Sequence, residues 1–523
     1  MCDLNKAKTF YDYLEVNNAK LFTLVCLPKC CGTFPTVIIR TPYVDRESVQ
    51  SEDEIGKNRL NEFKYWLDNG YAVVFQHCRG CGKSTGDCIP YINEREDGLY
   101  LQDWIRKQPF YNGELYLCGS SYLASVHFVT APFADDIKGA ILQVQDCERY
   151  NCNYRNGFYK KGLHGGWYVI MYKKKSMPTK NYTKQSYNML PLSNFSKSVF
   201  GENAEDFDEI LKHPDRNDPF WNTRYGGGEA HNAIKNANIP ILLVTGFYDI
   251  YTGGIFDMWN AMGCETKSKS ALVVHPFNHG CNGEEQPINF ENGNLNENFE
   301  NYSVRWFDAI RGKCETPFRQ GNVTYYKLFD NKWCCDDFSK TEQHQKIGLG
   351  KGSVSYVYNP ENPATFQGGL STNFGGAAWQ DPPNLREDII TVYTPEFTED
   401  TFIKGKIHGK LKVKSDCEDT CFYMRLSLCK TDGDYGLRDD IHQISNFCNN
   451  YIPNTEIEMD FSFDEHAFVV KKGEKLRIDI SSSAFPYYVR HTNNKGLFSA
   501  QSTTKIANNS VILENSYIEL PIG

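Results

Sequence analysis

The sequence predicts an α/β core that is interrupted by a helical insertion and followed by an all-β domain. Three observations support this fold class. Between residues 36 and 145, short apolar runs alternate with helical patterns, which is typical of a mostly parallel sheet with helices on both faces. Residues 146–236 contain helix-like runs without clear strands. Beyond residue 312, apolar and polar residues alternate with a period of two, which indicates a β-sandwich or jelly roll.

The core elements follow from runs of apolar residues separated by turns and amphipathic helices. The predicted strands are residues 15–25, 36–40, 71–76, 114–118, 140–145, 239–245 and 271–274. The predicted helices between them are residues 61–69, 93–107 and 122–130. The strand at 71–76 is almost continuously apolar, as expected for a strand that is buried on both faces.

These patterns divide the chain into three predicted domains. Residues 1–145 and 237–312 form the two parts of the core, residues 146–236 form a helical insertion, and residues 313–523 form the β domain. The period-two segments of the β domain include 323–328, 389–394, 409–414, 422–428 and 475–480.

Composition limits the classes of partner. The chain is 40% hydrophobic and 23% charged, and its net charge of −9 is spread without long acidic or basic blocks. This charge distribution predicts neither a nucleic-acid surface nor a polybasic membrane patch. Residues 1–16 lack the apolar region of a signal peptide, and no apolar run reaches the ~18 residues that a membrane helix needs. We therefore expect a cytoplasmic protein without a nucleic-acid or membrane partner.

The 19 cysteines are scattered and odd in number, so we expect reduced thiols. Cys78 and Cys81 form a lone CxxC pair, and no second ligand pair at a suitable spacing accompanies it. The loop at 78–86 contains three glycines and Lys83 but lacks the spacing of a phosphate-binding P-loop. We therefore predict no metal and no cofactor.

Residues 114–130 predict a nucleophile elbow, in which a serine lies at a sharp turn between a strand and a helix. The turn is Gly119-Ser120-Ser121, and the helix begins at Tyr122. Gly119 tolerates a strained approach, and the helix directs free N–H groups and its positive dipole end toward Ser121. An ordinary strand-to-helix turn remains the alternative for this tripeptide taken alone.

A nucleophilic serine requires a base and an acid that orients the base. Asp249 and His279 follow two predicted strands and come after Ser121 in the chain. Catalytic groups in open α/β sheets lie at the carboxyl ends of strands. We therefore predict His279 as general base and Asp249 as its orienting acid, with His275 and Asp257 as the alternatives.

The oxyanion of an acyl-transfer reaction needs two hydrogen-bond donors. The backbone N–H of Tyr122 is one of them, because it follows the nucleophile. The loop after the strand at 36–40 could supply the second donor through the hydroxyl of Tyr43. From the residues alone, a surface tyrosine held by Pro42 is the favoured interpretation of Tyr43.

The sequence resembles the CocE/NonD hydrolases, the cocaine esterase and X-Pro dipeptidyl-peptidase group of S15 type. The segments that carry the resemblance are 40–43 (RTPY), 78–86, 93–124, 246–254 (GFYDIYTGG), 275–280 (HPFNHG), 358–369 and 476–494. The family pattern G-x-S-Y-x-G is matched by Gly119, Ser121 and Tyr122, with Ala124 in place of the last glycine.

The resemblance implies an α/β-hydrolase core, an inserted helical cap and a C-terminal jelly roll of galactose-binding-like type. It implies Ser121, Asp249 and His279 as the catalytic triad. It also implies Tyr43 and Tyr122 as the oxyanion hole, which reverses the preference drawn from the residues alone.

We assign Tyr251 and Trp167 to the substrate pocket. The α-amino acid ester hydrolases of this group carry acids just after the catalytic aspartate, and these acids bind the substrate ammonium. The corresponding positions here are Ile250, Tyr251 and Thr252. Specificity for an ammonium is therefore not expected.

These observations predict a serine hydrolase that cleaves an ester or amide bond of a small-molecule or peptide-like substrate through an acyl-enzyme. An acyltransferase or peptide-releasing enzyme and an X-Pro dipeptidyl-peptidase are alternatives that use the same triad. A catalytically inert carbohydrate-binding protein is the remote alternative. A homodimer is left open.

Overall fold

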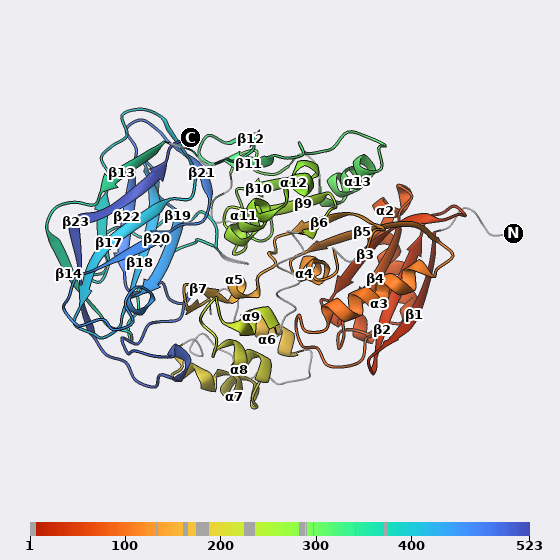
Figure 1. Cartoon of the computed structure of the whole chain (residues 1–523), viewed down its shortest axis with the longest axis horizontal. Helices are drawn as coiled ribbons and strands as arrows, with labels where there is room; N and C mark the ends of the chain where they lie inside the picture. The colour runs from red at the N-terminus through yellow and green to blue at the C-terminus, as the bar shows by residue number, and fades with distance from the viewer. Residues whose placement is uncertain are drawn as a thin grey trace.

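The computed structural model contains an α/β part, coloured red to green in Figure 1, and a C-terminal β part, coloured teal to blue. Short helices of the inserted segment lie below and between these two parts in the same view. The structure describes residues 7–131, 134–160, 166–173, 188–223, 236–281, 288, 290–295, 298–339, 341, 343–370 and 375–523. Among these residues, no helix is long and apolar enough to cross a bilayer.

The α/β part is built on a 10-stranded sheet of order β1-β2-β4-β3-β5-β6-β9-β10-β11-β12. Its strands are β1 (Lys8–Val16), β2 (Ala19–Leu27), β3 (Phe34–Thr41), β4 (Ala72–His77), β5 (Tyr111–Ser120), β6 (Ile137–Gln143), β9 (Ile241–Gly246), β10 (Ala271–His275), β11 (Val323–Lys327) and β12 (Lys332–Asp336). The strands from β4 to β11 in this order run parallel, and the outer pairs are antiparallel. Every side chain of β4, β9 and β10 is buried, which explains their continuous apolar sequences.

Helices cover the sheet between its parallel strands. They are α1 (Glu52–Glu62), α2 (Lys64–Asp68), α3 (Glu94–Arg106), α4 (Tyr122–Phe128), α11 (Thr252–Ala261), α12 (Cys264–Lys269) and α13 (Phe299–Ile310). The apolar side of α3 buries Leu101 and Ile105. A Cβ atom at Gly98 would lie 2.8 Å from Thr130 Cγ2, so the glycine allows α3 to approach the segment that follows α4 closely. The predicted alternation of strands and helices is confirmed.

Two segments differ from the sequence prediction. Residues 15–25, predicted as one strand, instead span a hairpin of β1 and β2 that turns at Asn17 and Asn18. Both asparagines have positive φ, 43° and 62°, as a tight hairpin turn requires.

The second difference concerns residues 323–328, which the sequence analysis placed in the β domain. They form β11, which pairs in parallel with β10 and extends the α/β sheet. The next strand, β12, lies at the sheet edge, and most of its residues are partly or fully exposed. Its pattern of exposure therefore resembles that of a sandwich strand with one face in solvent. The expected boundary at residue 313 therefore does not separate the two sheets.

The inserted segment between β6 and β9 is mainly helical where it is described. It contains α5 (Arg149–Asn153), the hairpin of β7 (Tyr154–Arg155) and β8 (Phe158–Tyr159), α6 (Gly166–Lys173), α7 (Phe195–Phe200), α8 (Glu205–Ile210) and α9 (Pro219–Thr223). Its buried aromatic residues pack on one another, with the ring centroid of Phe207 5.2 Å from that of Tyr168 and 5.4 Å from that of Phe195.

The C-terminal part is a sandwich of antiparallel sheets, as predicted. One sheet has the order β13-β23-β17-β20, with β14 also paired to β23, and the other has the order β15-β22-β18-β19, while β16 pairs with β21. The strands are β13 (His344–Gly348), β14 (Ser353–Tyr358), β15 (Ile390–Tyr393), β16 (Thr401–Gly405), β17 (His408–Ser415), β18 (Cys421–Lys430), β19 (Gly433–Gln443), β20 (Ile457–Ser462), β21 (His466–Val470), β22 (Lys475–Ser481) and β23 (Ala507–Pro521).

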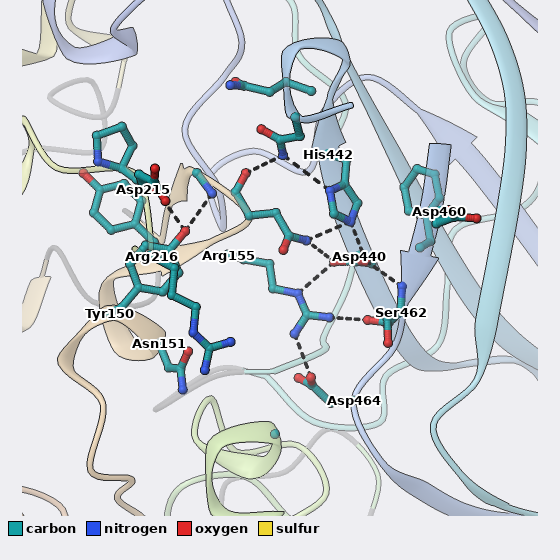
Figure 2. Close-up of a pocket in the computed structure, with 18 of the residues that line it drawn as sticks. Tyr150, Asn151, Arg155, Asp215, Arg216, Asp440, His442, Asp460, Ser462 and Asp464 are labelled. Atoms are coloured by element: carbon teal, nitrogen blue, oxygen red, sulfur yellow. Dashed lines mark hydrogen bonds and ion pairs between the residues drawn. The ribbon is translucent and has the colours of Figure 1, made fainter. Parts of the chain in front are cut away.

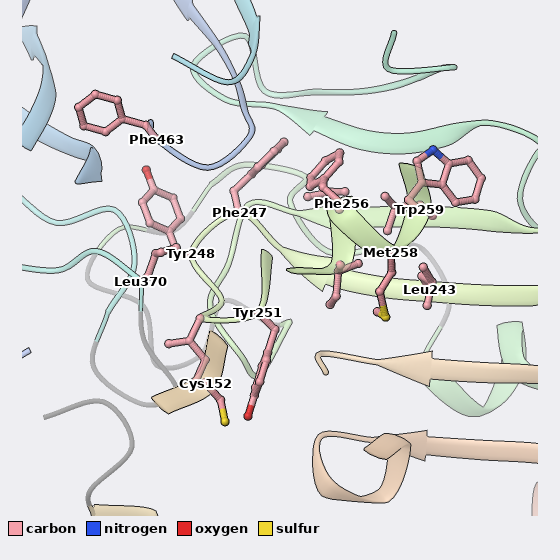
Figure 3. Close-up of a cluster of buried hydrophobic side chains, with 14 of the residues drawn as sticks. Cys152, Leu243, Phe247, Tyr248, Tyr251, Phe256, Met258, Trp259, Leu370 and Phe463 are labelled. Atoms are coloured by element: carbon pink, nitrogen blue, oxygen red, sulfur yellow. The ribbon is translucent and has the colours of Figure 1, made fainter. Parts of the chain in front are cut away.

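The α/β part and the β part share a hydrophobic core and a polar cavity. Figure 3 shows Phe247 and Tyr248, which follow β9, close to Leu370 and Phe463 of the β part. The Tyr248 hydroxyl donates to the carbonyl of Gly436 at 3.0 Å. A polar cavity of about 770 Å³ lies among the inserted segment, α11 and the β part (Figure 2).

Candidate active site

Ser121 lies at a strained turn between β5 and α4. Its backbone angles are φ 56° and ψ −127°, a conformation that a non-glycine residue adopts only when its surroundings hold it there. The Ser121 N–H donates to Gln143 O on β6 at 2.8 Å, and its carbonyl accepts from Ala124 N–H at 2.9 Å. A Cβ atom at Gly119 would lie 2.0 Å from Leu123 O, so only glycine fits this position. The geometry is that of a nucleophile elbow.

His279 lies between Ser121 and Asp249. Its Nε2 atom is 2.9 Å from Ser121 Oγ, and its Nδ1 atom is 2.9 Å from Asp249 Oδ1. The Asp249 side chain is fully buried, and its second carboxylate oxygen accepts a hydrogen bond from Thr245 Oγ1 at 3.2 Å. Because the carboxylate binds the proton on Nδ1, Nε2 can accept the proton of the serine hydroxyl.

The loops that carry Asp249 and His279 pack backbone to backbone. Phe247 N–H donates to His275 O at 2.8 Å, and Tyr248 N–H donates to Phe277 O at 3.0 Å. A Cβ atom at Gly246 would lie 2.1 Å from Phe277 O. The glycine at the end of β9 therefore allows the close approach that sets the distance between acid and base.

Tyr43 lies beside the nucleophile, at the end of β3. Its phenol forms hydrogen bonds with Ser121 and Trp167, and Trp167 Nε1 donates to the phenol oxygen at 2.9 Å. The residue as a whole is 43% exposed, but its hydroxyl end is enclosed, and this burial raises the pKa of Tyr43 to about 12. The phenol is therefore protonated at neutral pH and can donate a hydrogen bond.

Tyr122 is the first residue of α4, where backbone N–H groups have no partner within the helix. Its side chain holds the turn in place. The phenol donates to Glu94 Oε1 at 2.7 Å and accepts from Tyr91 N–H at 2.9 Å. Glu94 in turn pairs with buried Arg40 at 3.0 Å. The phenol of Tyr43 and the backbone of Tyr122 therefore both lie beside Ser121.

Both residues assigned to the pocket lie next to the three predicted catalytic side chains. Trp167 lies in the first turn of α6 and stacks on Tyr91 and Tyr122, with ring centroids 5.6 and 6.0 Å apart. Tyr251 is buried, and its ring centroid is 5.6 Å from that of His279. Trp167 therefore lies on the side of Ser121, and Tyr251 lies on the side of His279.

The alternative base and acid lie elsewhere. His275 is buried against Trp333, with ring centroids 5.3 Å apart, and this burial lowers its pKa to about 4. It is therefore a neutral packing residue at the end of β10. Asp257 is on the exposed side of α11, where it pairs with Lys406 at 3.3 Å. Of the two candidate bases and two candidate acids, His279 and Asp249 make the hydrogen bonds that lead to Ser121.

Sequence reasoning missed Arg149 and Tyr91, which also lie at the site. The guanidinium of Arg149 is 3.6 Å above the centroid of the Tyr91 ring. Arg149 follows the carboxyl end of β6, and this is the signal that could have identified it, because polar residues at such positions line the sites of α/β sheets.

A strained serine and a buried acid–histidine pair at the carboxyl ends of a parallel sheet are the arrangement found in serine hydrolases of the α/β-hydrolase fold. The comparison with family models gives the particular family. The X-Pro dipeptidyl-peptidase (S15 family) model matches residues 17–281, which is half of the chain, and the X-Pro dipeptidyl-peptidase C-terminal non-catalytic domain model matches residues 315–517. The chain belongs to the S15 family.

A curated relative matches nearly the whole chain. Cocaine esterase from Rhodococcus sp. (strain MB1 Bresler) is 22% identical over 538 residues, which cover 91% of this chain and 90% of the relative. The family and this relative show that the protein is a serine hydrolase of the CocE/NonD type, acting on ester or amide bonds.

Solved structures share the whole fold. An α-amino acid ester hydrolase aligns with a TM-score of 0.83 and 17% identity, covering 100% of this chain and 98% of that chain. An aminopeptidase from a Thaumarchaeota archaeon of marine sediment has a TM-score of 0.81 and 15% identity, covering 100% and 97%. A CocE/NonD family hydrolase from Staphylococcus aureus has a TM-score of 0.68 and 15% identity, covering 99% and 94%. At these identities the likeness establishes the fold.

Proposed function

We propose that Ser121, His279 and Asp249 carry out acyl transfer from an ester or amide to water. The observation that supports this proposal most strongly is the continuous chain of two 2.9 Å contacts from Ser121 through His279 to Asp249. In this mechanism His279 takes the proton of Ser121 as the hydroxyl attacks the substrate carbonyl. Asp249 holds the imidazole and stabilises the imidazolium that forms.

The tetrahedral intermediate carries a negative oxygen, which the Tyr43 phenol and the Tyr122 N–H stabilise. His279 then donates its proton to the leaving alcohol or amine, and the carbonyl re-forms as an acyl ester of Ser121. Water, deprotonated by the same histidine, hydrolyses this ester and restores the enzyme. The proton of Ser121 therefore leaves with the alcohol or amine, and a proton taken from water replaces it, so Ser121 and His279 end the cycle in their starting protonation states.

The substrate pocket does not favour an ammonium group. The residues that follow Asp249 are Ile250, Tyr251 and Thr252, so the loop offers no carboxylate there. We propose small-molecule or peptide-like acyl substrates recognised without a free amine. The S15 family match supports an X-Pro dipeptidyl-peptidase as the second candidate.

A matched substrate panel tests the proposal. Purified protein is assayed with aryl esters, an aryl amide and an X-Pro amide, each beside Ser121→Ala. We expect ester turnover that Ser121→Ala lowers by several powers of ten. Turnover that survives in Ser121→Ala would contradict the proposed nucleophile. Assays with added alcohols or amines separate hydrolysis from acyl transfer, because a transferase converts these acceptors to acyl products.

The cellular location is a further part of the proposal. Every cysteine that the structure describes is a free thiol, which supports a reducing compartment such as the cytoplasm. Fractionation of cells that make the tagged protein tests this location.

A further inference from the structure

Arg149, on the first turn of α5, is a buried cation with an unused hydrogen-bond donor. Only 7% of the residue is exposed. Its Nη1 atom is buried, and among the residues that the structure describes it has no hydrogen-bond partner and Arg149 forms no ion pair. Burying a charged group without a counter-charge is costly, so such groups are usually paired.

The guanidinium lies in a ring of neutral groups. One face rests 3.6 Å above the Tyr91 ring, and Nη2 donates to Cys152 Sγ. The hydroxyl groups of Tyr251 and Tyr168 also interact with its charge. Burial raises the pKa of the Cys152 thiol although Arg149 opposes this shift, so the thiol is neutral and does not balance the cation.

Two acids line the same small cavity as Arg149, but both are engaged elsewhere. Asp146 accepts hydrogen bonds from Asn151 Nδ2 at 3.0 Å and from Glu148 N–H at 3.1 Å. Glu94 pairs with Arg40 and accepts from a tyrosine, as described above. Neither acid therefore uses the free donor of Arg149.

Arg149 also lies between the two sides of the active site. The Tyr91 ring below it stacks on Tyr122 with centroids 4.4 Å apart. Tyr251 lies beside the triad histidine on the other side, and Figure 3 shows Tyr251 next to Cys152. Burial raises the pKa of Tyr43, and the charge of Arg149 is among the influences that oppose this rise, so the cation acts on the oxyanion donor as well.

We propose that Arg149 binds a carboxylate of the substrate, so that the enzyme acts on esters or amides that carry a negative charge near the scissile bond. This inference rests on the proposed function of Ser121. A guanidinium forms short, charge-assisted hydrogen bonds with carboxylates, and Tyr91 holds it in one orientation. The same cation repels a substrate ammonium, which agrees with the absence of acids after Asp249.

Two matched substrate pairs test the inference at constant ionic strength. The acyl-side pair is the 4-nitrophenyl hemiester of adipic acid and 4-nitrophenyl hexanoate, which differ by a carboxylate in place of a methyl group. The leaving-group pair is 4-acetoxybenzoate and 4-acetoxybenzamide. We expect kcat/KM to favour the anion in at least one pair by about 10- to 100-fold, the range for a hydrogen bond to a charged group.

The variant Arg149→Met removes the charge and keeps an unbranched apolar side chain. It is expected to reduce the ratio of kcat/KM between anion and neutral partner to about one. The matched control is Arg216→Met, which removes an exposed arginine of the same segment that pairs with Glu148 at 2.6 Å. The control is expected to keep the wild-type ratio.

Wild-type enzyme with no preference for the anion in either pair would overturn the inference. An equal loss for both members in Arg149→Met would also overturn it, because it indicates a structural role. Labelling of Ser121 by a fluorophosphonate separates these results from failure of the proposed function. Labelling without anion preference leaves the hydrolase intact and rejects the subsite, whereas absence of labelling rejects both.

If Arg149→Met does not fold, competitive inhibition of the wild-type enzyme tests the carboxylate subsite instead. Adipate and adipamide are compared as competitive inhibitors of hexanoate ester hydrolysis. Adipate is expected to bind at least tenfold more tightly than adipamide. Equal inhibition constants would contradict a carboxylate subsite.

Discussion

At the residue scale, enclosure by neighbouring side chains decides the chemical role of a group. Tyr43 and Tyr65 are both partly exposed tyrosines, yet only the hydroxyl of Tyr43 lies beside Ser121. Enclosure keeps the phenol of Tyr43 protonated, because its pKa rises to about 12. It therefore remains a hydrogen-bond donor throughout the pH range in which a histidine base works.

The variant Tyr43→Phe removes this donor and little else. We expect kcat to fall by about 100- to 1000-fold while KM changes little, because the hydrogen bond strengthens only when the oxyanion forms. Steady-state kinetics with an aryl ester measure the two constants. Tyr65→Phe on α2 is the control, and an unchanged kcat in Tyr43→Phe would remove this residue from the oxyanion hole.

Asp146 is a buried acid, and its ionisation is expected to make the stability of the protein depend on pH. Burial raises its pKa from 3.8 to about 7, so the folded state favours the neutral acid. An acid whose pKa is higher in the folded state than in the unfolded state contributes stability at low pH, and this stability is lost as the pH rises through the folded-state pKa. We therefore expect the Tm of the wild type to fall between about pH 4 and pH 7 relative to that of Asp146→Asn, which cannot ionise.

Differential scanning calorimetry at several pH values measures this difference between the two proteins. Glu465 is also buried with a pKa near 7, so both proteins retain its contribution and only their difference reports on Asp146. Parallel Tm curves for the two proteins would show that Asp146 is charged in the folded state.

At the scale of elements, the positions of the predicted catalytic residues follow from the parallel sheet. Ser121, Asp249 and His279 follow β5, β9 and β10, whose carboxyl ends meet at one edge. Their chain order and strand ends were readable as patterns, so the sequence could predict that they meet. The Asn17-Asn18 hairpin was not predicted, although two asparagines with positive φ are a known turn signal. The β11 strand was misplaced because its side chains alternate in part between buried and partly exposed positions, much as those of a sandwich strand do.

The nucleophile elbow is expected to tolerate only glycine at position 119. Gly119→Ala places a methyl group 2.0 Å from the Leu123 carbonyl oxygen, a backbone atom that cannot move without breaking the turn. We expect a loss of at least ~2 kcal/mol in the free energy of unfolding, together with loss of ester turnover. Chemical denaturation measures the stability.

Gly348→Ala is the matched control for this variant, because no atom lies within 4 Å of the position of its Cβ and its φ is ordinary. It is expected to retain wild-type stability and turnover. Equal stability of Gly119→Ala and the control would show that the elbow relaxes around a side chain.

At the scale of the whole molecule, one arginine ties the inserted segment to the β part. Arg155 lies at 2.8 Å from Asp440 and 2.7 Å from Asp464, and it donates to the carbonyl of Ser462 at 2.6 Å (Figure 2). A Cβ atom at Gly253 would lie 2.5 Å from Asp464, so this network rests on the start of α11, just after Asp249. The three parts of the chain therefore meet next to Asp249, the proposed orienting acid.

Removal of Arg155 should loosen this junction. In Arg155→Met the carboxylates of Asp440 and Asp464 lose their arginine partner while remaining largely buried, although Asp440 keeps His442 at 3.1 Å, and we expect a loss of about 3 kcal/mol in stability. Thermal unfolding measures the effect. The control Lys410→Met breaks a surface pair with Glu458, which is worth at most about 1 kcal/mol. A similar Tm for the two variants would show that the junction does not depend on Arg155.

The sequence predicted the architecture of the molecule better than the details of its pocket. Domain-scale patterns sum over many residues, so local errors such as the β11 assignment leave the fold class unchanged. The role of Arg149 depends on the absence of a partner, and only the structure shows which side chains lie around it. Its position after β6 was visible, but its isolation among tyrosines was not.

The central claim is that Ser121 is a nucleophile activated by His279. Labelling with a fluorophosphonate, followed by intact-mass and peptide mass spectrometry, tests it most directly. We expect one phosphonyl group per wild-type chain, located on the peptide that contains Ser121, slower labelling of His279→Ala and none of Ser121→Ala. Labelling of Ser121→Ala at the wild-type rate, or of another residue in the wild type, would contradict the claim.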